Sequence, residues 1–363
     1  MSSIYGKNFQ ISTWGESHGP GLGVVVDGCP AGLEVSAEEV QKELDKRKPG
    51  QSKLTTPRKE GDKVEILSGV FEGKTTGTPI SMVIFNQDQR SHDYGDMVKL
   101  YRPSHADLTY DMKYGFRDYR GGGRSSARET AGRVAAGALA KLILKKVANT
   151  EFLAWVDQIG PVKAQIDKAT VTTEQVEAHP TRCPEPEAAA QMEKEILAAR
   201  KSQDSIGGVV TLRVSNPPVG LGEPIFDRVE SNLARAMLSI PATKGFEIGS
   251  GFEGVSLRGS QHNDSIYFEE GRFRTRTNNA GGTLGGISNG EDIDCRIAFK
   301  PTATISQDQE TVDKEGTSAI LKAKGRHDPC VVPRAPVIVE AMAAITLLDL
   351  YLEQRAKQNL FEV

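Results

Sequence analysis

The densest group of side chains able to do chemistry lies in the segment 117–133, RDYRGGGRSSARETAGR, which places five arginines around three consecutive glycines. Glycines let backbone N–H groups approach a ligand closely, and the N-terminus of a following helix offers unpaired donors and a positive dipole. Arginine adds planar, bidentate, charge-assisted hydrogen bonds. The segment therefore predicts a phosphate site, and a salt-bridged surface turn is the alternative.

An RNA-contacting Arg-Gly tract is a second interpretation of this segment, because Tyr119 adds an aromatic ring. Tracts of that kind are repetitive and disordered, whereas this one occurs once and runs straight into an apolar helix. The formal net charge of -3 also excludes a surface that grips nucleic acid or anionic lipid as a whole. We therefore expect a local anion site and no nucleic-acid partner.

The segment 15–19, GESHG, matches the GxSxG pattern of serine hydrolases, with Ser17 as the nucleophile. That pattern requires a helix directly afterwards, but Pro20 leads into another apolar strand. What remains is a glycine-flanked loop that presents Ser17 and His18 with little steric cover. The loop suits a general acid with its hydrogen-bond partner, and a structural histidine is the alternative.

A second histidine lies in RPSHAD, where Ser104 is predicted to cap a helix whose first residue is His105 and whose third is Asp107. A helix N-terminus favours neutral imidazole, while a bound anion favours imidazolium. We expect His105 to titrate near neutrality. A surface histidine beside a cap is the alternative.

Three segments toward the C-terminus add weaker signals. In GRHDPC, Asp328 is a candidate base, and a structural carboxylate paired with Arg326 or Arg334 is the alternative. The segment 300–304, KPTAT, ends a strand in hydroxyls and a cation. The glycine-rich segment 280–286 could admit a flat ligand.

The elements that must position these residues follow from hydrophobic period and from capping signals. Strands are predicted over 9–14, 22–26, 64–71, 80–85, 209–214 and 293–299. Capping boxes predict three helices: Ser36 with Glu39 (to about Lys48), Ser126 with Glu129 (to about Lys146) and Asp227 with Glu230 (to about Ser239).

The helix after Ser126 is apolar or small on nearly every side, which predicts a central helix layer between sheets. A last helix over 337–357 fits a core or a subunit interface. The segment 165–203 is rich in Glu, Lys, Ala and Pro, and we expect a peripheral insertion there with one surface helix and no catalytic residue.

Composition sets the remaining expectations. The 363 residues, with 38% hydrophobic and 26% charged, are consistent with one globular domain over 1–363. The four cysteines are scattered without metal-ligand spacing, so we expect reduced, structural thiols and no metal. The N-terminal region lacks an apolar signal core and no run is long enough for a membrane span, which predicts a cytosolic protein without a membrane partner.

Taken together, GESHG, RPSHAD, YRGGGRSSARET, AGGTLGGIS, KPTAT and GRHDPC resemble the signature blocks of the chorismate synthase family, in the family's order and across nearly the whole chain. The resemblance implies an α/β fold: a β-α-β sandwich with central helices between two sheets. It also implies a homotetramer. The predicted buried helix after Ser126 agrees with such a layer.

The resemblance further implies a carbon–oxygen lyase acting on a phosphate. The reaction is the anti-1,4-elimination of phosphate from 5-enolpyruvylshikimate 3-phosphate to give chorismate, the last step of the shikimate pathway to the aromatic amino acids. Reduced FMN is required although the reaction has no net redox change. By residue matching, His18 protonates the leaving phosphate, His105 stabilises the anionic reduced flavin, and Asp328 helps flavin N5 act as a base. Ser17 and Ser126 match a proton relay with His18.

The same matching assigns the binding residues. The substrate would contact Arg47, Lys53, Arg102, Arg128 and Arg326. The FMN site would comprise Arg124, Ser125, Ser126, Pro241, Ala242, Gly285, Lys300, Pro301, Thr302, Ala303, Thr304 and Arg326.

The chain departs from the family pattern in two places. Lys53 stands where many members have arginine, which weakens a bidentate contact, and the order Pro336-Val337 is reversed, which shifts a helix start. An external flavin reductase is favoured over NADPH-dependent reduction by this chain, since no spare domain is visible. The alternative activity is a flavin-dependent oxidoreductase that transfers hydride to or from an anionic metabolite.

Overall fold

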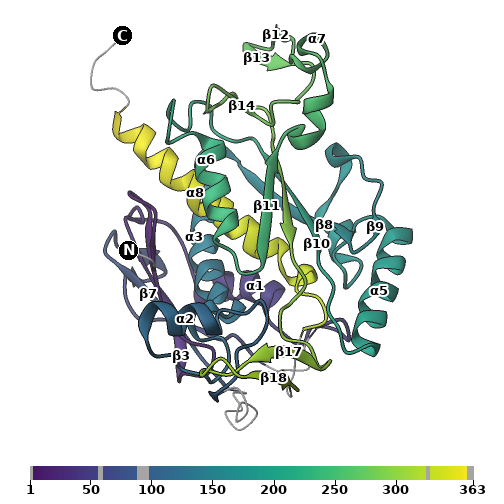
Figure 1. The fold of residues 1–363 in the computed structure, drawn as a ribbon. Helices are drawn as coiled ribbons and strands as arrows, with labels where there is room; N and C mark the ends of the chain where they lie inside the picture. The colour runs from purple at the N-terminus through teal and green to yellow at the C-terminus, as the bar shows by residue number, and fades with distance from the viewer. Residues whose placement is uncertain (1–2, 56–59, 88–97, 324–327, 358–363) are drawn as a thin grey trace.

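Two five-stranded antiparallel sheets enclose a layer of helices in the computed structural model, which describes residues 3–55, 60–87, 98–323 and 328–357 (Figure 1). The first sheet, in spatial order, consists of β1 (Ile4–Tyr5), β2 (Gln10–Gly15), β3 (Gly21–Asp27), β7 (Ile80–Phe85) and β4 (Val64–Ile66). The second consists of β11 (Thr243–Ile248), β16 (Ile293–Phe299), β10 (Gly208–Ser215), β8 (Glu151–Ile159) and β9 (Val162–Lys163).

The helix layer connects the two sheets. It contains α1 (Ala37–Arg47), α3 (Thr130–Ala148), α6 (Val229–Leu238) and α8 (Pro336–Lys357). α3 packs on β3 and on α8, while α8 packs on β8 and β10, and Figure 1 shows α8 crossing the centre of the molecule. The predicted β-α-β sandwich is confirmed.

Close helix contact explains the small residues of α3. Residues 134–140, nearly two full turns, are all buried, so this part of α3 is enclosed on every side. A Cβ atom on Gly137 would lie 2.4 Å from the Cβ atom of Ala341 in α8, so only glycine permits this spacing of the two helices. α8 is buried over most of its length, which places it in the core.

Local signals set several boundaries as predicted. The capping box of α1 forms, with Ser36 accepting from the Glu39 backbone N–H and Glu39 accepting from that of Ser36. α8 begins at Pro336, where a proline is favoured because its missing N–H would have no intrahelical partner. The predicted strand 64–71 is divided into β4 and β5 (Val70–Phe71), because Gly69 turns the chain with φ of 78°.

Two predicted capping boxes are wrong. The Ser126 hydroxyl accepts from the Arg128 N–H and begins a short 3-10 helix, Ala127–Glu129, so α3 starts only at Thr130. The Glu129 carboxylate pairs with Arg133 one turn later. Asp227 does not cap α6, because its carboxylate accepts from Lys7 Nζ at 2.9 Å.

Shorter elements surround the sandwich. They are α2 (Asp107–Tyr114), α4 (Thr173–Glu177), α5 (Pro186–Lys201), α7 (Gly259–His262), and the hairpins β5–β6 (β6 Lys74–Thr75), β12–β13 (Ile266–Glu269, Arg272–Thr275), β14–β15 (Thr283–Leu284, Ile287–Ser288) and β17–β18 (Gln309–Val312, Ser318–Leu321). The segment 165–203 contains two α-helices, not one, and α5 packs on β8 and β9. None of the described helices is long and apolar enough to cross a membrane.

Candidate active site

A cavity of about 460 Å³ lies where the N-terminal ends of α3 and α8 meet the end of β16 and the chain that enters β11. Its volume is within the range of roughly 300–1,000 Å³ that is usual for small-molecule sites. The cavity brings together residues that the sequence separates by up to 291 positions, from Arg47 to Ile338. Twelve of its lining residues are predicted site residues: Arg47, His105, Ser125, Ser126, Pro241, Ala242, Lys300, Pro301, Thr302, Ala303, Thr304 and Asp328.

The charges around this cavity favour an anion. Its described lining includes the cationic side chains of Arg47, Lys300 and Arg334, and a single carboxylate, that of Asp328. His105 adds a titratable imidazole. Such an excess of one sign in a concave site raises the local concentration of ligands of the opposite sign.

Two residues of the cavity wall hold unusual backbone conformations. Ser104 has φ of 58° and Ala242 has φ of 72°, both in the left-handed region that disfavours side chains. Lys300 fixes both, because its Nζ donates to the Ser104 carbonyl at 3.0 Å and its backbone N–H donates to the Ala242 carbonyl at 2.9 Å. Backbone strain retained in this way is typical of ligand sites.

Ser17 and His18 form the pair expected from the GESHG loop. The loop joins two antiparallel strands, β2 and β3, which confirms that no hydrolase-type helix follows Ser17. The Ser17 hydroxyl lies 2.9 Å from His18 Nδ1. Gly121 covers the ring: a Cβ atom there would lie 2.4 Å from Nδ1, and the residue has φ of 73°. The arginine-rich turn therefore packs directly on His18.

His105 is held by a carboxylate instead of by a helix cap, so the predicted cap is wrong. α2 begins at Asp107, and the left-handed backbone of Ser104 prevents it from capping. His105 Nδ1 lies 3.0 Å from Asp107 Oδ1. Arg102 binds the same carboxylate through Nε and NH2, each at 2.7 Å.

Asp328 is paired with Arg334. Arg334 NH1 donates to Asp328 Oδ2 at 3.0 Å, and its Nε donates to the Arg47 carbonyl at 3.1 Å. This is the structural pairing given above as the alternative for Asp328, so a role as a base stays a prediction. Arg334 is a site residue that the sequence analysis did not assign, and its only signal was an arginine six positions after Asp328.

Arg47 and Arg128 share one buried carboxylate behind the cavity. Asp62 accepts from Arg47 NH1 at 2.6 Å and from Arg128 NH1, and all three side chains are buried. Burial alone raises the pKa of Asp62, but the two guanidinium groups outweigh it and hold that pKa below its usual range. Arg47 also donates to Thr130 Oγ1 and to the Ala127 carbonyl, which ties α1 to the start of α3.

The arginines of segment 117–133 are bound within the protein, as in a salt-bridged turn. Arg124 donates to carbonyl groups of β2, at Thr13 and Gly15. The other partners are Asp107 and Asp111 for Arg117, Asp118 for Arg120, Asp62 for Arg128 and Glu129 for Arg133. These side chains shape the turn, while Ser125 and Ser126 line the cavity.

Five predicted binding residues are not among the cavity's described lining: Lys53, Arg102, Arg124, Arg128 and Gly285. Lys53 is 67% exposed and pairs with Glu193 of α5. Gly285 lies in the turn between β14 and β15 and is not among the cavity's described lining. Arg326 lies outside the described residues.

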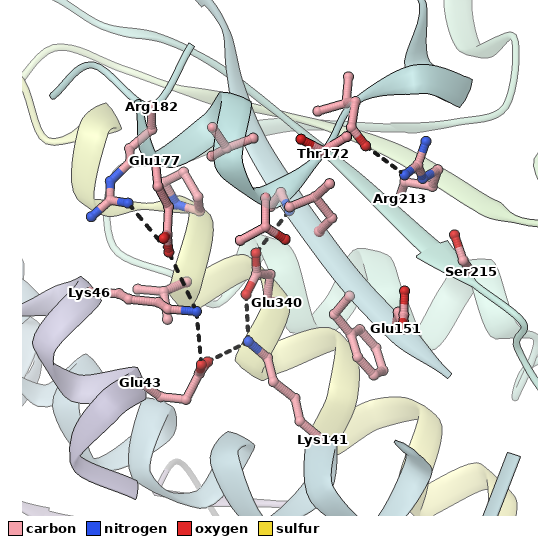
Figure 2. Close-up of a pocket in the computed structure, with 18 of the residues that line it drawn as sticks. Glu43, Lys46, Lys141, Glu151, Thr172, Glu177, Arg182, Arg213, Ser215 and Glu340 are labelled. Carbon is pink, nitrogen blue, oxygen red and sulfur yellow. Dashed lines mark hydrogen bonds and ion pairs between the residues drawn. The ribbon is translucent and has the colours of Figure 1, made fainter. Parts of the chain in front are cut away.

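A larger cavity, of about 750 Å³, lies between α1, α3, α4 and β8 (Figure 2). Its charges neutralise one another: Glu177 lies 3.8 Å from Lys46, which lies 3.2 Å from Glu43, and Lys141 binds both Glu43 and Glu340. No predicted site residue lines it. Volume alone would favour this cavity as the active site. The predicted site residues and the excess of cationic side chains favour the smaller cavity.

The cysteines are consistent with structural thiols. All four are buried and unpaired in the described structure. Burial raises the pKa of Cys29 and of Cys183 to about 11, so neither forms a thiolate near neutral pH. The described residues contain no cluster of three His, Cys, Asp or Glu side chains arranged for a metal ion.

The cavity also has apolar walls that the sequence analysis did not assign. They comprise Ile240, Phe299, Val331, Ala335 and Ile338. All five flank predicted segments, but only the fold reveals that they face one cavity. Such walls suit a flat, partly apolar ring system.

Comparison with known proteins shows the family of this chain. The family model for chorismate synthase matches residues 9–352. Chorismate synthase of Synechocystis sp. is 59% identical over 358 residues, which cover 98% of this chain and 99% of that protein. Chorismate synthase of Thermosynechococcus vestitus is 56% identical over 361 residues, 99% of each chain. A crystal structure of chorismate synthase, 34% identical, matches with a TM-score of 0.76 and covers 96% of this chain and 93% of that one.

Proposed function

Because this chain belongs to the chorismate synthase family, we propose that it converts 5-enolpyruvylshikimate 3-phosphate to chorismate by anti-1,4-elimination of phosphate, with reduced FMN required and no net redox change. This makes it a carbon–oxygen lyase acting on a phosphate, at the last step of the shikimate pathway to the aromatic amino acids. The observation that carries the proposal is the cavity itself, where Arg47, Lys300 and Arg334 face His105 and Asp328. A substrate with one phosphate and two carboxylates matches that charge.

The donors present fit FMN. The apolar wall of Phe299, Ile338 and their neighbours suits a flat ring, while the hydroxyls of Thr302 and Thr304 and the Lys300 ammonium suit polar and phosphate oxygens. Ser125, Ser126 and Ala242 complete this wall. When bound, reduced FMN supplies electron density to the substrate transiently as phosphate leaves.

We assign the proton steps and the stabilising charge to four side chains. Since His18 Nδ1 is bonded to Ser17, Nε2 is the atom that would protonate the departing phosphate. His105 would place positive charge beside the reduced ring, and Asp328, oriented by Arg334, would assist proton removal from the substrate. Ser126 lines the cavity and would relay protons to His18.

The proposal also covers the oligomeric state of the protein, its location and the source of its reduced FMN. A homotetramer is supported by exposed apolar side chains on the β12–β13 hairpin, including Phe273 at 74% and Ile266 at 64% exposure. We propose a cytoplasmic location and reduction of FMN by an external, NADPH-dependent flavin reductase.

Anaerobic release of phosphate from 5-enolpyruvylshikimate 3-phosphate, with and without photoreduced FMN, tests the activity. The proposal expects phosphate and chorismate only when reduced FMN is present. A flavin oxidoreductase would instead consume reductant in proportion to product. No release under either condition, from folded protein at saturating ligand, would refute the proposal.

A further inference from the structure

Asp107 collects more charged hydrogen bonds than a helix-starting carboxylate needs. Its side chain is buried, with 4% of the residue exposed. It accepts from Arg102 Nε and NH2 at 2.7 Å and from Arg117 NH1 at 3.1 Å, and its Oδ1 lies 3.0 Å from His105 Nδ1. The Arg102 backbone N–H adds a further bond at 3.1 Å. The arginine groups can only donate, so the carboxylate acts as their acceptor.

The protonation states follow from this arrangement. Burial alone opposes ionisation of Asp107, but the hydrogen bonds from Arg102 and His105 and their charges outweigh it and hold the pKa of Asp107 below its usual range. Asp107 is therefore ionised at neutral pH. A carboxylate can accept only, which requires the hydrogen of neutral His105 to lie on Nδ1.

The Arg102 guanidinium also binds the turn that packs against His18. Arg102 NH2 donates to the Gly121 carbonyl at 2.8 Å, and Gly121 is the residue that packs against the His18 ring. Arg102 thus joins the carboxylate that holds His105 to the turn that holds His18. Partners of this kind orient a functional imidazole and are worth about 10–100-fold in activity where they have been removed.

We infer that Asp107 is a positioning residue that fixes His105 in the Nδ1–H tautomer and so assigns Nε2 to the ligand in the cavity, with Arg102 holding the Asp107 carboxylate in place. The kinetic consequence rests on the proposed function. The tautomer of His105 does not rest on the proposed function, because it depends only on contacts among residues of the protein.

The first test reads the tautomer directly. The 15N chemical shifts of the His105 imidazole are measured in the wild-type protein without flavin or substrate, at a pH where the ring is neutral. The chain has six histidines, so His105→Gln identifies the signals. We expect a protonated Nδ1 and an unprotonated Nε2. The opposite pattern overturns the inference, whatever reaction the protein catalyses.

The second test uses a matched pair of variants on α2. Asp107→Ala removes the His105 contact, whereas Asp111→Ala removes the other carboxylate bound to Arg117, whose Nε lies 3.1 Å from Asp111 Oδ2. We expect Asp107→Ala to lose the Nδ1–H preference and to lower kcat about 10–100-fold, with a smaller change in KM. Asp111→Ala should keep both the tautomer and kcat.

The outcomes of these tests distinguish failure of the positioning role of Asp107 from failure of the proposed function. If Asp107→Ala shifts the tautomer but keeps wild-type kcat, the positioning role is refuted. If the wild-type protein forms no chorismate, the proposed function fails and the tautomer measurement still decides the inference. If Asp107→Ala does not fold, Asp107→Asn replaces it. An asparagine has a single acceptor oxygen for donors that now use two, so the same loss of Nδ1–H preference and kcat is expected, and retention of both refutes the role.

Discussion

Adding one methyl group at Gly121 should disable His18 although residue 18 itself is unchanged. The new Cβ atom would lie 2.4 Å from His18 Nδ1 and 2.5 Å from Cε1, well inside contact distance. The ring must therefore move and lose its alignment with Ser17. If His18 is the general acid, Gly121→Ala should lower turnover by roughly 10²–10⁴-fold, the range usual for such groups.

The destabilisation caused by alanine in a left-handed backbone can be separated from the effect of the clash with His18. Gly121 has φ of 73°, and an alanine in the left-handed region costs about 1–2 kcal/mol. Gly123, two residues away, has φ of 49° and open space where its Cβ atom would lie. Gly123→Ala therefore has the same kind of backbone penalty without the clash.

Urea unfolding and steady-state phosphate release would be measured on both variants. We expect both to lose about 1–2 kcal/mol of stability, and only Gly121→Ala to lose turnover. Equal turnover in the two variants would refute the reasoning, because the position of His18 would then not matter to the reaction.

Three further predictions concern other parts of the site. His18→Ala and His105→Ala should each lower turnover roughly 10²–10⁴-fold while circular dichroism shows an intact fold, and wild-type turnover in both would remove these roles. Asp328→Ala should slow the return of the flavin to its resting reduced form in single-turnover absorbance traces, and unchanged traces would exclude the residue. Asp62→Asn should lower the free energy of unfolding at neutral pH by about 3–5 kcal/mol, because it leaves two buried guanidinium groups without their carboxylate. The pKa of Asp62 is depressed in the folded protein, so its contribution to stability is present above the ordinary carboxyl pKa of about 3.9 and is lost as the pH falls toward the folded pKa. The urea midpoints of the wild-type protein and Asp62→Asn should therefore converge in acid. A gap between the midpoints that stays constant with pH would contradict the ion pair.

The parts of the fold that depend on residues close together in the sequence were predictable. The Ser36 capping box and strands β7 and β16 appear where their local patterns place them. The apolar circumference of α3 correctly predicted a helix enclosed on several sides. The order of motifs identified the sandwich, because the family resemblance carries topology that periodicity does not.

Two of the wrong capping predictions involve partners far away in the chain. Asp227 was expected to cap α6, but Lys7 binds it. Ser104 was expected to cap α2, but its left-handed backbone is held by Lys300. Lys53 pairs with Glu193 of the insertion, and its predicted contact with the substrate stays a prediction. Local propensity cannot reveal such competition, because the competing charge is brought in by tertiary structure.

The same limit applies to the site. The sequence analysis selected His18 and His105 as candidates but did not identify Gly121 and Asp107 as the residues that hold them. Gly121 was assigned only to a phosphate loop, and its contact with His18 appears only when segments about 100 residues apart come together.

The measurement that tests the central claim most directly is the number of chorismate molecules formed per molecule of reduced FMN oxidised, under strict anaerobiosis with no other reductant. The account predicts many turnovers, with chorismate and phosphate in equal amounts and the flavin still reduced at the end. One product per flavin oxidised, or product formed equally well without reduced flavin, would contradict it.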